Sequence, residues 1–170
     1  MADVLDDLLA PGLALVVCGS AAGNVSAALR QYYAHPQNKF WRTLHVTGLT
    51  PRLLSPAEYR ELLAFGIGLT DVVKDQSGSD SQLDYRRASP EVLREKLLRL
   101  APAVCAFNGK RAARGFLGRA VEYGWQPEQV GATRLFVAPS TSPAASGSWD
   151  VAHWRALARS VQRTREEEPA

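Results

Sequence analysis

The sequence contains no long apolar segment that could cross a membrane. None of its 170 residues belongs to a run of about eighteen apolar side chains, which is the minimum for a transmembrane helix. The first fifteen residues carry acidic side chains where a secretory signal peptide would carry basic ones. We therefore expect a cytoplasmic protein that has no membrane partner.

Cysteine is also scarce, and its placement argues against disulfide or metal chemistry. The only two cysteines, Cys18 and Cys105, each lie within an apolar stretch that is typical of a buried strand. A free thiol in that setting behaves as a small hydrophobic side chain, which fits a reducing compartment. We expect neither a metal ion nor a cofactor.

Two common phosphate-binding signatures are missing as well. The chain has neither a P-loop pattern nor a Gly-x-Gly-x-x-Gly sequence after its first apolar run. Of the functions considered for this chain, nucleotide binding is therefore the least favoured. A net charge of +3 and a pI near 9.1 permit a polyanionic partner, but they fall short of a protein that binds nucleic acid by charge alone.

Short apolar segments alternate with helical patterns along the chain. This alternation predicts parallel strands joined by right-handed crossovers, and hence a three-layer α/β/α sandwich around a short, mainly parallel sheet. The length fits one domain over residues 1–170, with 166–170 as a frayed tail. Strands are expected at residues 13–19, 67–73, 103–107 and 134–138, and helices at 26–31, 55–65, 89–101, from about 109, and 150–163.

Ligands of such sheets bind beyond the carboxyl ends of the strands, which directs attention to the loops 19–26, 70–84 and 139–149. The first loop is built of small residues that let a backbone approach a ligand, although they equally permit tight packing. An aromatic segment follows it. Tyr33 is placed there to stack on a flat ligand, while a hydrogen bond within the turn is favoured for His35 and a helix cap is an alternative role for Asn38.

Taken together, these motifs resemble the mismatch-specific uracil and thymine DNA glycosylases of the uracil DNA glycosylase superfamily. The matching features are the small-residue loop, the Tyr-Ala-His-Pro-x-Asn-x-Phe-Trp run at 33–41, Gly-Leu-Thr at 68–70 and Pro-Ser-Thr-Ser-Pro at 139–143. The resemblance implies a monomeric, metal-free enzyme that flips a base out of double-stranded DNA containing uracil or a mismatch, and hydrolyses its N-glycosidic bond. Its substrate would be the DNA of a bacterial nucleoid.

The resemblance also assigns residues to contacts, and two of them depart from the family pattern. Ala21 stands where relatives carry an asparagine that positions the attacking water, and Ala144 or Ala145 stands where they carry a wedge residue. Either catalysis has moved to another residue, or activity is reduced while binding to a damaged site remains. Base contacts are expected from Ser20, Ala21, Tyr33 and Asn38, and DNA contacts from Ser26, Lys110, Ser140, Thr141, Ser142 and Ala144.

Asp71 is the best candidate for the catalytic residue. Loss of a base builds positive charge on the deoxyribose, so the site needs an anion near the sugar and a positioned water. Asp71 ends the second strand and can supply a carboxylate there. Its alternative role is a turn cap or an ion pair with Arg86. The competing candidates are Asp75, Asp80 and Asp84, with Asn108 as a further water ligand or a turn-ordering residue.

Two functional alternatives stay open from the sequence. The hypoxanthine DNA glycosylases of the same superfamily also have Gly-Ser in the first loop and a Tyr-Tyr-x-His-Pro run, as residues 19–20 and 32–36 do here. The absence of a water-positioning side chain at Ala21 favours a second alternative, a non-catalytic protein that binds damaged or abasic DNA.

Overall fold

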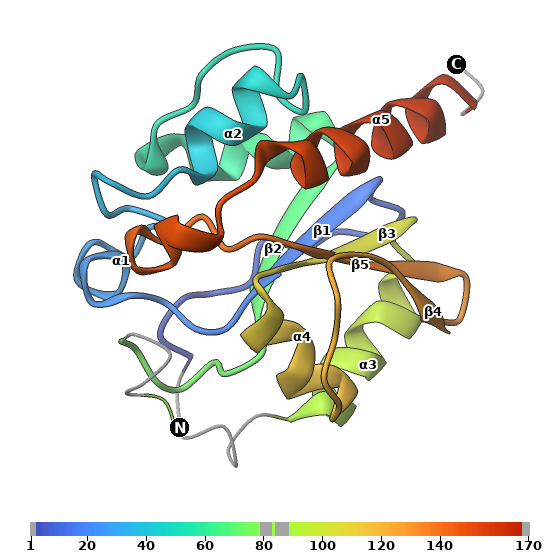
Figure 1. Cartoon of the computed structure of the whole chain (residues 1–170), viewed down its shortest axis with the longest axis horizontal. Coiled ribbons are helices and arrows are strands. Elements are labelled where there is room, and N and C mark those ends of the chain that lie inside the picture. The colour runs from blue at the N-terminus through green and yellow to red at the C-terminus, as the bar shows by residue number, and fades with distance from the viewer. Residues whose placement is uncertain (1–2, 79–82, 84–88, 168–170) are drawn as a thin grey trace.

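The computed structural model describes residues 3–78, 83 and 89–167, and it shows a central sheet with helices on both faces (Figure 1). The five strands have the order β2-β1-β3-β5-β4. The first four in this order run parallel, whereas β4 pairs antiparallel with β5. The expected three-layer sandwich with a mainly parallel sheet is therefore confirmed. The strands are β1 (Leu15–Gly19), β2 (Ile67–Asp71), β3 (Val104–Asn108), β4 (Gly124–Val130) and β5 (Thr133–Ala138).

The helices form two layers that enclose the sheet. One face is covered by α3 (Pro90–Leu100) and α4 (Lys110–Leu117), and the other by α2 (Phe40–Val46), the 3-10 helix η1 (Pro56–Phe65) and α5 (Val151–Glu167) (Figure 1). Side chains of β1 alternate between the layers: Leu15 and Val17 pack into the α2 and α5 side, and Cys18 into the α3 and α4 side. Cys18 and Cys105 are buried free thiols, as expected.

Several helices differ from the expectation in position or type. The short α1 (Asn24–Leu29) begins two residues early, and η1 is a 3-10 rather than an α-helix. Its capping box between Ser55 and Glu58 and its end at Gly66 are as expected. The expected tail is wrong for residues 166 and 167, which continue α5, and residues 168–170 lie outside the described part.

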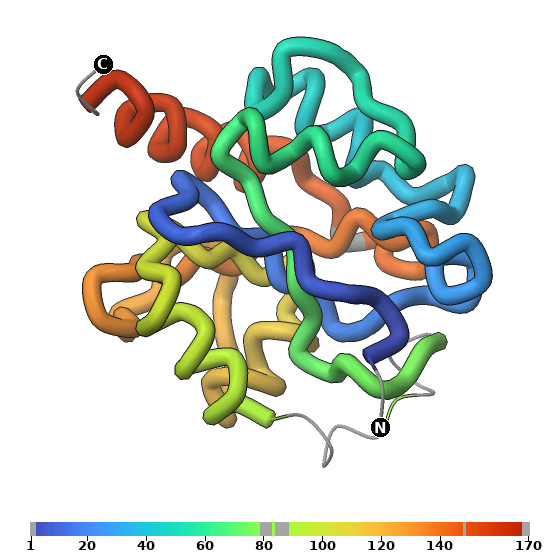
Figure 2. Tube along the Cα trace, turned by 180° about the vertical axis from the view of Figure 1, so that it is seen from behind, coloured from blue at the N-terminus to red at the C-terminus, as the bar shows by residue number. Residues whose placement is uncertain are grey.

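The N-terminal segment lies along the outer edge of β2, opposite β1 (Figure 2). Leu8 pairs with Leu69 in an antiparallel bridge, and the amide of Val4 donates to the carbonyl of Lys74 at 2.7 Å. The segment therefore brings Asp7 next to the end of β2. Among the described residues, no helix is long and apolar enough to cross a membrane.

Candidate active site

The carboxyl ends of the parallel strands bring the three expected loops together. The carbonyls of Gly19 and Ser20 accept hydrogen bonds from the amides of Val72 and Val73, at 2.9 and 2.8 Å. On the other side of β1, the carbonyl of Thr141 accepts a hydrogen bond from the amide of Lys39 at 3.0 Å. The first loop (19–26), the segment after β2 and the loop 139–149, which we call the late turn, therefore line one edge of the sheet.

Gly19 ends β1 at the point where two polar side chains meet. A Cβ atom at this position would lie 2.7 Å from Oδ1 of Asp71 and 2.9 Å from the hydroxyl of Tyr33. Both distances are too short for a side chain to fit. The glycine therefore lets a carboxylate and a phenol approach the same point, a requirement that no local motif indicates.

Asp71 is buried at this point, with 6% of its surface exposed. It pairs in register with Gly19. Burial raises the pKa of its carboxyl from 3.8 to about 6, although the ammonium of Lys74 lowers it. The group is therefore ionised at neutral pH, and its pKa lies close to the working range of a general base.

Tyr33 is held in an uncommon backbone conformation beside Asp71. Its φ of 52° lies in the left-handed region, which costs a tyrosine about 1 kcal/mol or more. Both neighbours are fixed: the carbonyl of Tyr32 accepts from Nε1 of Trp41 at 3.1 Å, and the amide of Ala34 donates to Oγ of Ser26 at 2.9 Å. These contacts hold the backbone on both sides of Tyr33, and its ring stacks on that of Phe40 with the ring centres 4.0 Å apart.

The hydroxyl of Tyr33 is buried and has no hydrogen-bond partner among the described residues. Burial and the charge of Asp71 raise the pKa of the phenol, which therefore remains protonated. Asn108 lies beside this hydroxyl, but its side chain exchanges two hydrogen bonds with Thr141. Since buried polar groups are nearly always paired, Tyr33 offers a donor to a ligand or a water at this point.

A charged network behind Asp71 was not expected from the sequence. Nζ of Lys74 lies 3.9 Å from Oδ2 of Asp71 and 2.8 Å from Oδ1 of Asp7. Asp7 also binds Nζ of Lys96 at 2.6 Å and Oγ1 of Thr70 at 2.7 Å. The network links three distant parts of the chain, so no local motif could reveal it. A cavity of about 320 Å³ opens beside it, lined by Asp3, Asp71, Val72, Lys74, Asp75, Ser89, Val92, Leu93 and Lys96.

Removing the ammonium of Lys74 is expected to raise the pKa of Asp71. An opposite charge within about 4–6 Å ordinarily lowers a carboxyl pKa by about 1 unit or more, and Nζ of Lys74 lies 3.9 Å from Oδ2 of Asp71. The remaining charged neighbours are Lys96, which lowers this pKa, and Asp7 and Asp3, which raise it. Carbon NMR titration of the Asp71 carboxyl in Lys74→Met should show the increase, and Lys74→Arg should not. An unchanged pKa in Lys74→Met would contradict the assignment.

The charge of Asp71 should also reduce the stability of the fold at neutral pH. Because its pKa is raised from 3.8 to about 6, the folded state loses stability as the pH rises through this window. Asp71→Asn should therefore be more stable than the wild type at pH 8 by roughly 2 to 3 kcal/mol. Urea unfolding at pH 8 and at pH 3.5 measures the difference, which should vanish at the lower pH. Equal stability of the wild type and Asp71→Asn at pH 8 would show that burial of the Asp71 charge does not destabilise the fold.

The remaining residues of the first loop and the aromatic run differ in exposure and in their hydrogen bonds. Ser20 and Ala21 are half-buried in the first loop, and the carbonyl of Ser20 is already bonded to Val73. Oδ1 of Asn38 accepts a hydrogen bond from the amide of Phe40 at 2.9 Å, but Asn38 is not the cap of α2, because the N-cap residue is Lys39. Nδ1 of His35 accepts from the amide of Gln37, so the turn role favoured for this histidine is confirmed.

Two side chains that were expected to contact DNA are buried and form hydrogen bonds within the protein instead. Ser26 is 5% exposed, and its hydroxyl accepts the hydrogen bond from Ala34. Thr141 is fully buried and bonded to Asn108, which thereby orders the late turn. These positions fit structural roles better than direct contact with a phosphate, because a phosphate of duplex DNA could not reach them.

The other expected DNA contacts lie at the surface. Ser140 and Ser142 are half-buried, and Oγ of Ser142 accepts from the amide of Ala144 at 3.3 Å, where the 3-10 helix η4 (Pro143–Ser148) begins. Ala144 is exposed. Nζ of Lys110 lies 3.7 Å from Glu122 and 4.5 Å from the ring centre of Tyr123. Its ammonium is therefore directed toward Glu122 and Tyr123.

Of the competing carboxylates, only Asp75 is described, and it is half-buried next to the same cavity as Asp71. Asp80, Asp84 and Arg86 lie outside the described residues. The ion pair considered for Asp71 with Arg86 is thus untested, whereas the pair with Lys74 is present.

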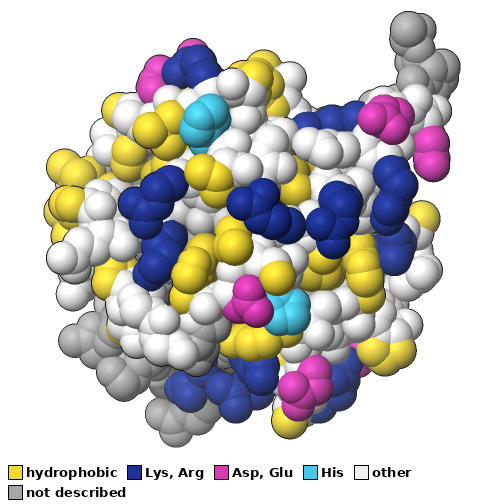
Figure 3. Space-filling view, turned by 45° about the horizontal axis from the view of Figure 1, so that its top comes forward, with side chains coloured by type: hydrophobic (Ala, Val, Ile, Leu, Met, Phe, Trp, Pro, Cys, Tyr) yellow, Lys and Arg dark blue, Asp and Glu magenta, His cyan; other side chains and the backbone are white. Residues whose placement is uncertain are grey.

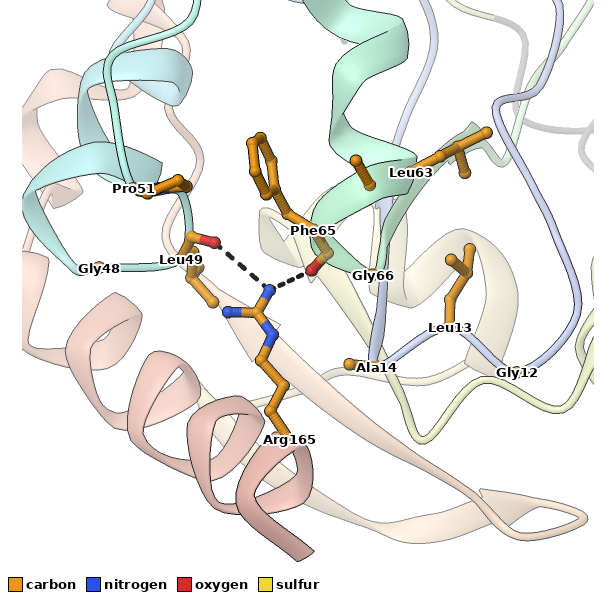
Figure 4. A pocket seen from close by; sticks show the side chains of 11 residues that line it. Gly12, Leu13, Ala14, Gly48, Leu49, Pro51, Leu63, Phe65, Gly66 and Arg165 are labelled. Atoms are coloured by element: carbon orange, nitrogen blue, oxygen red, sulfur yellow. Dashed lines mark hydrogen bonds between the residues drawn. The ribbon is translucent and has the colours of Figure 1, made fainter. Parts of the chain in front are cut away.

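A second cavity, of about 590 Å³, lies at the opposite edge of the sheet (Figure 4). It is lined mainly by apolar side chains and glycines of the segments that precede β1 and β2. The guanidinium of Arg165 donates to the backbone carbonyls of Leu49 and Phe65 (Figure 4). Among the described residues, no carboxylate lines this cavity, whereas Asp3, Asp71 and Asp75 line the smaller one.

Comparison with known proteins identifies the family and the fold of the chain. The family model of the uracil DNA glycosylase superfamily matches residues 7–158, almost the whole chain. A solution NMR structure from Methanosarcina acetivorans, provisionally described as a uracil DNA glycosylase, superposes with a TM-score of 0.68 at 21% identity. The match covers 93% of this chain and 96% of that one, and it shows a shared fold. The chain belongs to the uracil DNA glycosylase superfamily.

Proposed function

We propose that this protein is a DNA glycosylase that flips uracil out of double-stranded DNA, especially from G·U mismatches, and hydrolyses its N-glycosidic bond with Asp71 as the catalytic carboxylate. One observation supports the proposal above the others. Oδ1 of Asp71 and the hydroxyl of Tyr33, which has no hydrogen-bond partner among the described residues, both lie within 3 Å of the Cβ position of Gly19. A buried anion and a free donor thus converge at the edge where ligands of such sheets bind.

The chemistry requires an anion at this position. As the bond between the base and C1′ stretches, positive charge builds on the deoxyribose and negative charge on the leaving base. Asp71 stabilises the sugar cation and accepts a proton from the water that adds to C1′, and the departing base takes up a proton from solvent. Tyr33, whose hydroxyl has no partner in the described residues, donates a hydrogen bond within the same site.

A second function is supported by the absence of a polar side chain at residue 21. Ala21 cannot orient a water through its side chain, and Ala144 is too small to fill the space left by a flipped nucleotide. A protein with these two features could retain a damaged or abasic site without releasing a base. In this alternative Asp71 has a structural role: it forms an ion pair with Lys74, which also forms an ion pair with Asp7 of the N-terminal segment.

A panel of duplexes separates these functions. Single-turnover reactions with G·U, A·U and hypoxanthine duplexes, followed by alkaline cleavage, count the abasic sites that form. The proposal requires release of uracil, faster from G·U than from A·U. Faster release of hypoxanthine than of uracil would instead support the hypoxanthine branch of the superfamily. Tight binding to an abasic duplex without any release of base would support the non-catalytic alternative.

A further inference from the structure

A band of positive charge crosses the face formed by α2 and α5, outside the site at Asp71 (Figure 3). We define this cationic face by five side chains, namely Lys39, Arg42, Arg155, Arg159 and Arg163. All four arginines are exposed, and none of them forms an ion pair within the described residues. A row of unpaired cations repels itself, and a polyanion relieves that repulsion.

The helix pattern places three of these arginines in one row. Arg155, Arg159 and Arg163 are four residues apart on α5, so they share the outer side of the helix. The inner side packs Trp154, Leu157 and Val161 into the core. The row extends over about 12 Å, which is the axial length of about four phosphates in one DNA strand.

The cationic face is continuous with the late turn of the site. The amide of Lys39 donates to the carbonyl of Thr141, and its Nζ donates to Oγ of Ser146 at 3.0 Å and lies 5.5 Å from the ring centre of Trp149. On the other side, α2 contacts α5 through the rings of Phe40 and Trp154. A duplex that presents a nucleotide to Asp71 can therefore extend onto α5.

The composition of the face favours DNA over other anionic partners. The large exposed apolar side chains of the described residues are Leu29, Val46, Leu53, Val92 and Leu98. One of them, Val46, lies at the end of α2, and none lies on α5. A helix that inserts into an anionic membrane presents such side chains, and so does the centre of most protein interfaces. Phosphate contacts require only the charged row.

We propose that the cationic face binds the phosphate backbone of duplex DNA that flanks the excision site, independently of sequence. The inference depends on DNA being the substrate in the proposed function, but it does not depend on base release. Arginines that neutralise phosphates release counterions, so each contact contributes about 0.9 to the slope of log affinity against log salt.

The test compares two triple variants of equal charge. Arg155→Gln/Arg159→Gln/Arg163→Gln removes the row on α5, and Arg94→Gln/Arg99→Gln/Arg114→Gln removes three exposed arginines of α3 and α4 on the other side of the sheet. Circular dichroism and thermal unfolding establish that both variants fold. Fluorescence anisotropy then gives the affinity for undamaged duplexes of about one and about three helical turns, at several salt concentrations.

The α5 variant should lose at least about tenfold in affinity for the long duplex at low salt, and its salt slope should fall by about 2 to 3. The loss should be smaller on the short duplex and on both duplexes with the control variant. Equal losses in the two variants, or equal losses on short and long duplexes, would overturn the inference. If the wild type releases no uracil while the α5 variant behaves as expected, the proposed function fails alone. If uracil is released but the two variants bind alike, this inference fails alone.

Discussion

Replacing Asp71 by asparagine is expected to slow uracil release by about 10²–10³-fold. Asparagine has the same shape but carries no charge, so it can neither offset the positive charge on the sugar nor accept a proton from water. The environment at the end of β2 stays intact, because Lys74 keeps its ion pair with Asp7 at 2.8 Å. Single-turnover release from a G·U duplex, with enzyme in excess, measures the loss separately from product dissociation.

Asp75→Asn is the control for this result, since Asp75 lines the same cavity only four residues away. It should release uracil at nearly the wild-type rate. DNA affinity of Asp71→Asn should equal or exceed that of the wild type, because a buried negative charge near the phosphates is removed. If Asp75→Asn loses more activity than Asp71→Asn, the catalytic assignment is wrong and passes to the neighbouring carboxylate.

A methyl group at residue 19 should strongly reduce uracil release and also lower the stability of the fold, because it does not fit between buried groups. The Cβ of Gly19→Ala would lie 2.7 Å from Oδ1 of Asp71 and 2.9 Å from the hydroxyl of Tyr33, so both groups must move. Catalytic groups that move by about 1 Å commonly lose about a hundredfold in rate. We expect a loss of at least that size, measured in the single-turnover assay together with the unfolding temperature.

Gly23→Ala is the matched control in the same loop. A Cβ atom at Gly23 meets nothing within 4 Å, and the residue has an ordinary φ of −68°. This variant should keep uracil release within about threefold of the wild type, apart from a small loss of helix capping at α1. Similar activity of Gly19→Ala and Gly23→Ala would show that the point between Asp71 and Tyr33 is not part of the site.

The parallel core of the fold could be predicted because each of its strands is a short apolar run followed by a helical pattern. β4 lacks that signal. Its sequence, residues 124–130, is largely polar and includes Pro127, which an edge strand with an irregular register between Trp125 and Gln129 tolerates. The helix α2 was missed for a different reason, since its seven residues are too few to show a clear period.

Some features of the candidate site could likewise be predicted from the sequence, and others could not. Tyr33 and Asp71 could be proposed from local motifs, because Tyr33 stands in the aromatic run at 33–41 and Asp71 ends an apolar strand. Their roles stay predictions. The close approach at Gly19 and the contacts of Lys74 with Asp7 depend on segments far apart in the sequence, and such contacts follow only from the folded chain. Burial of Ser26 and Thr141 likewise results from the packing of the loops. It could not be predicted, because polar side chains in loops are usually exposed.

The most direct test of the central claim is the pH dependence of uracil release from a G·U duplex, in single turnover, by the wild type and by Asp71→Asn. Because the pKa of Asp71 is raised to about 6, the wild-type rate should increase as the pH rises through that value and level off above it. The rate of Asp71→Asn should be low and independent of pH in this range. Absence of release by the wild type at every pH, or the same profile in both proteins, would contradict the account.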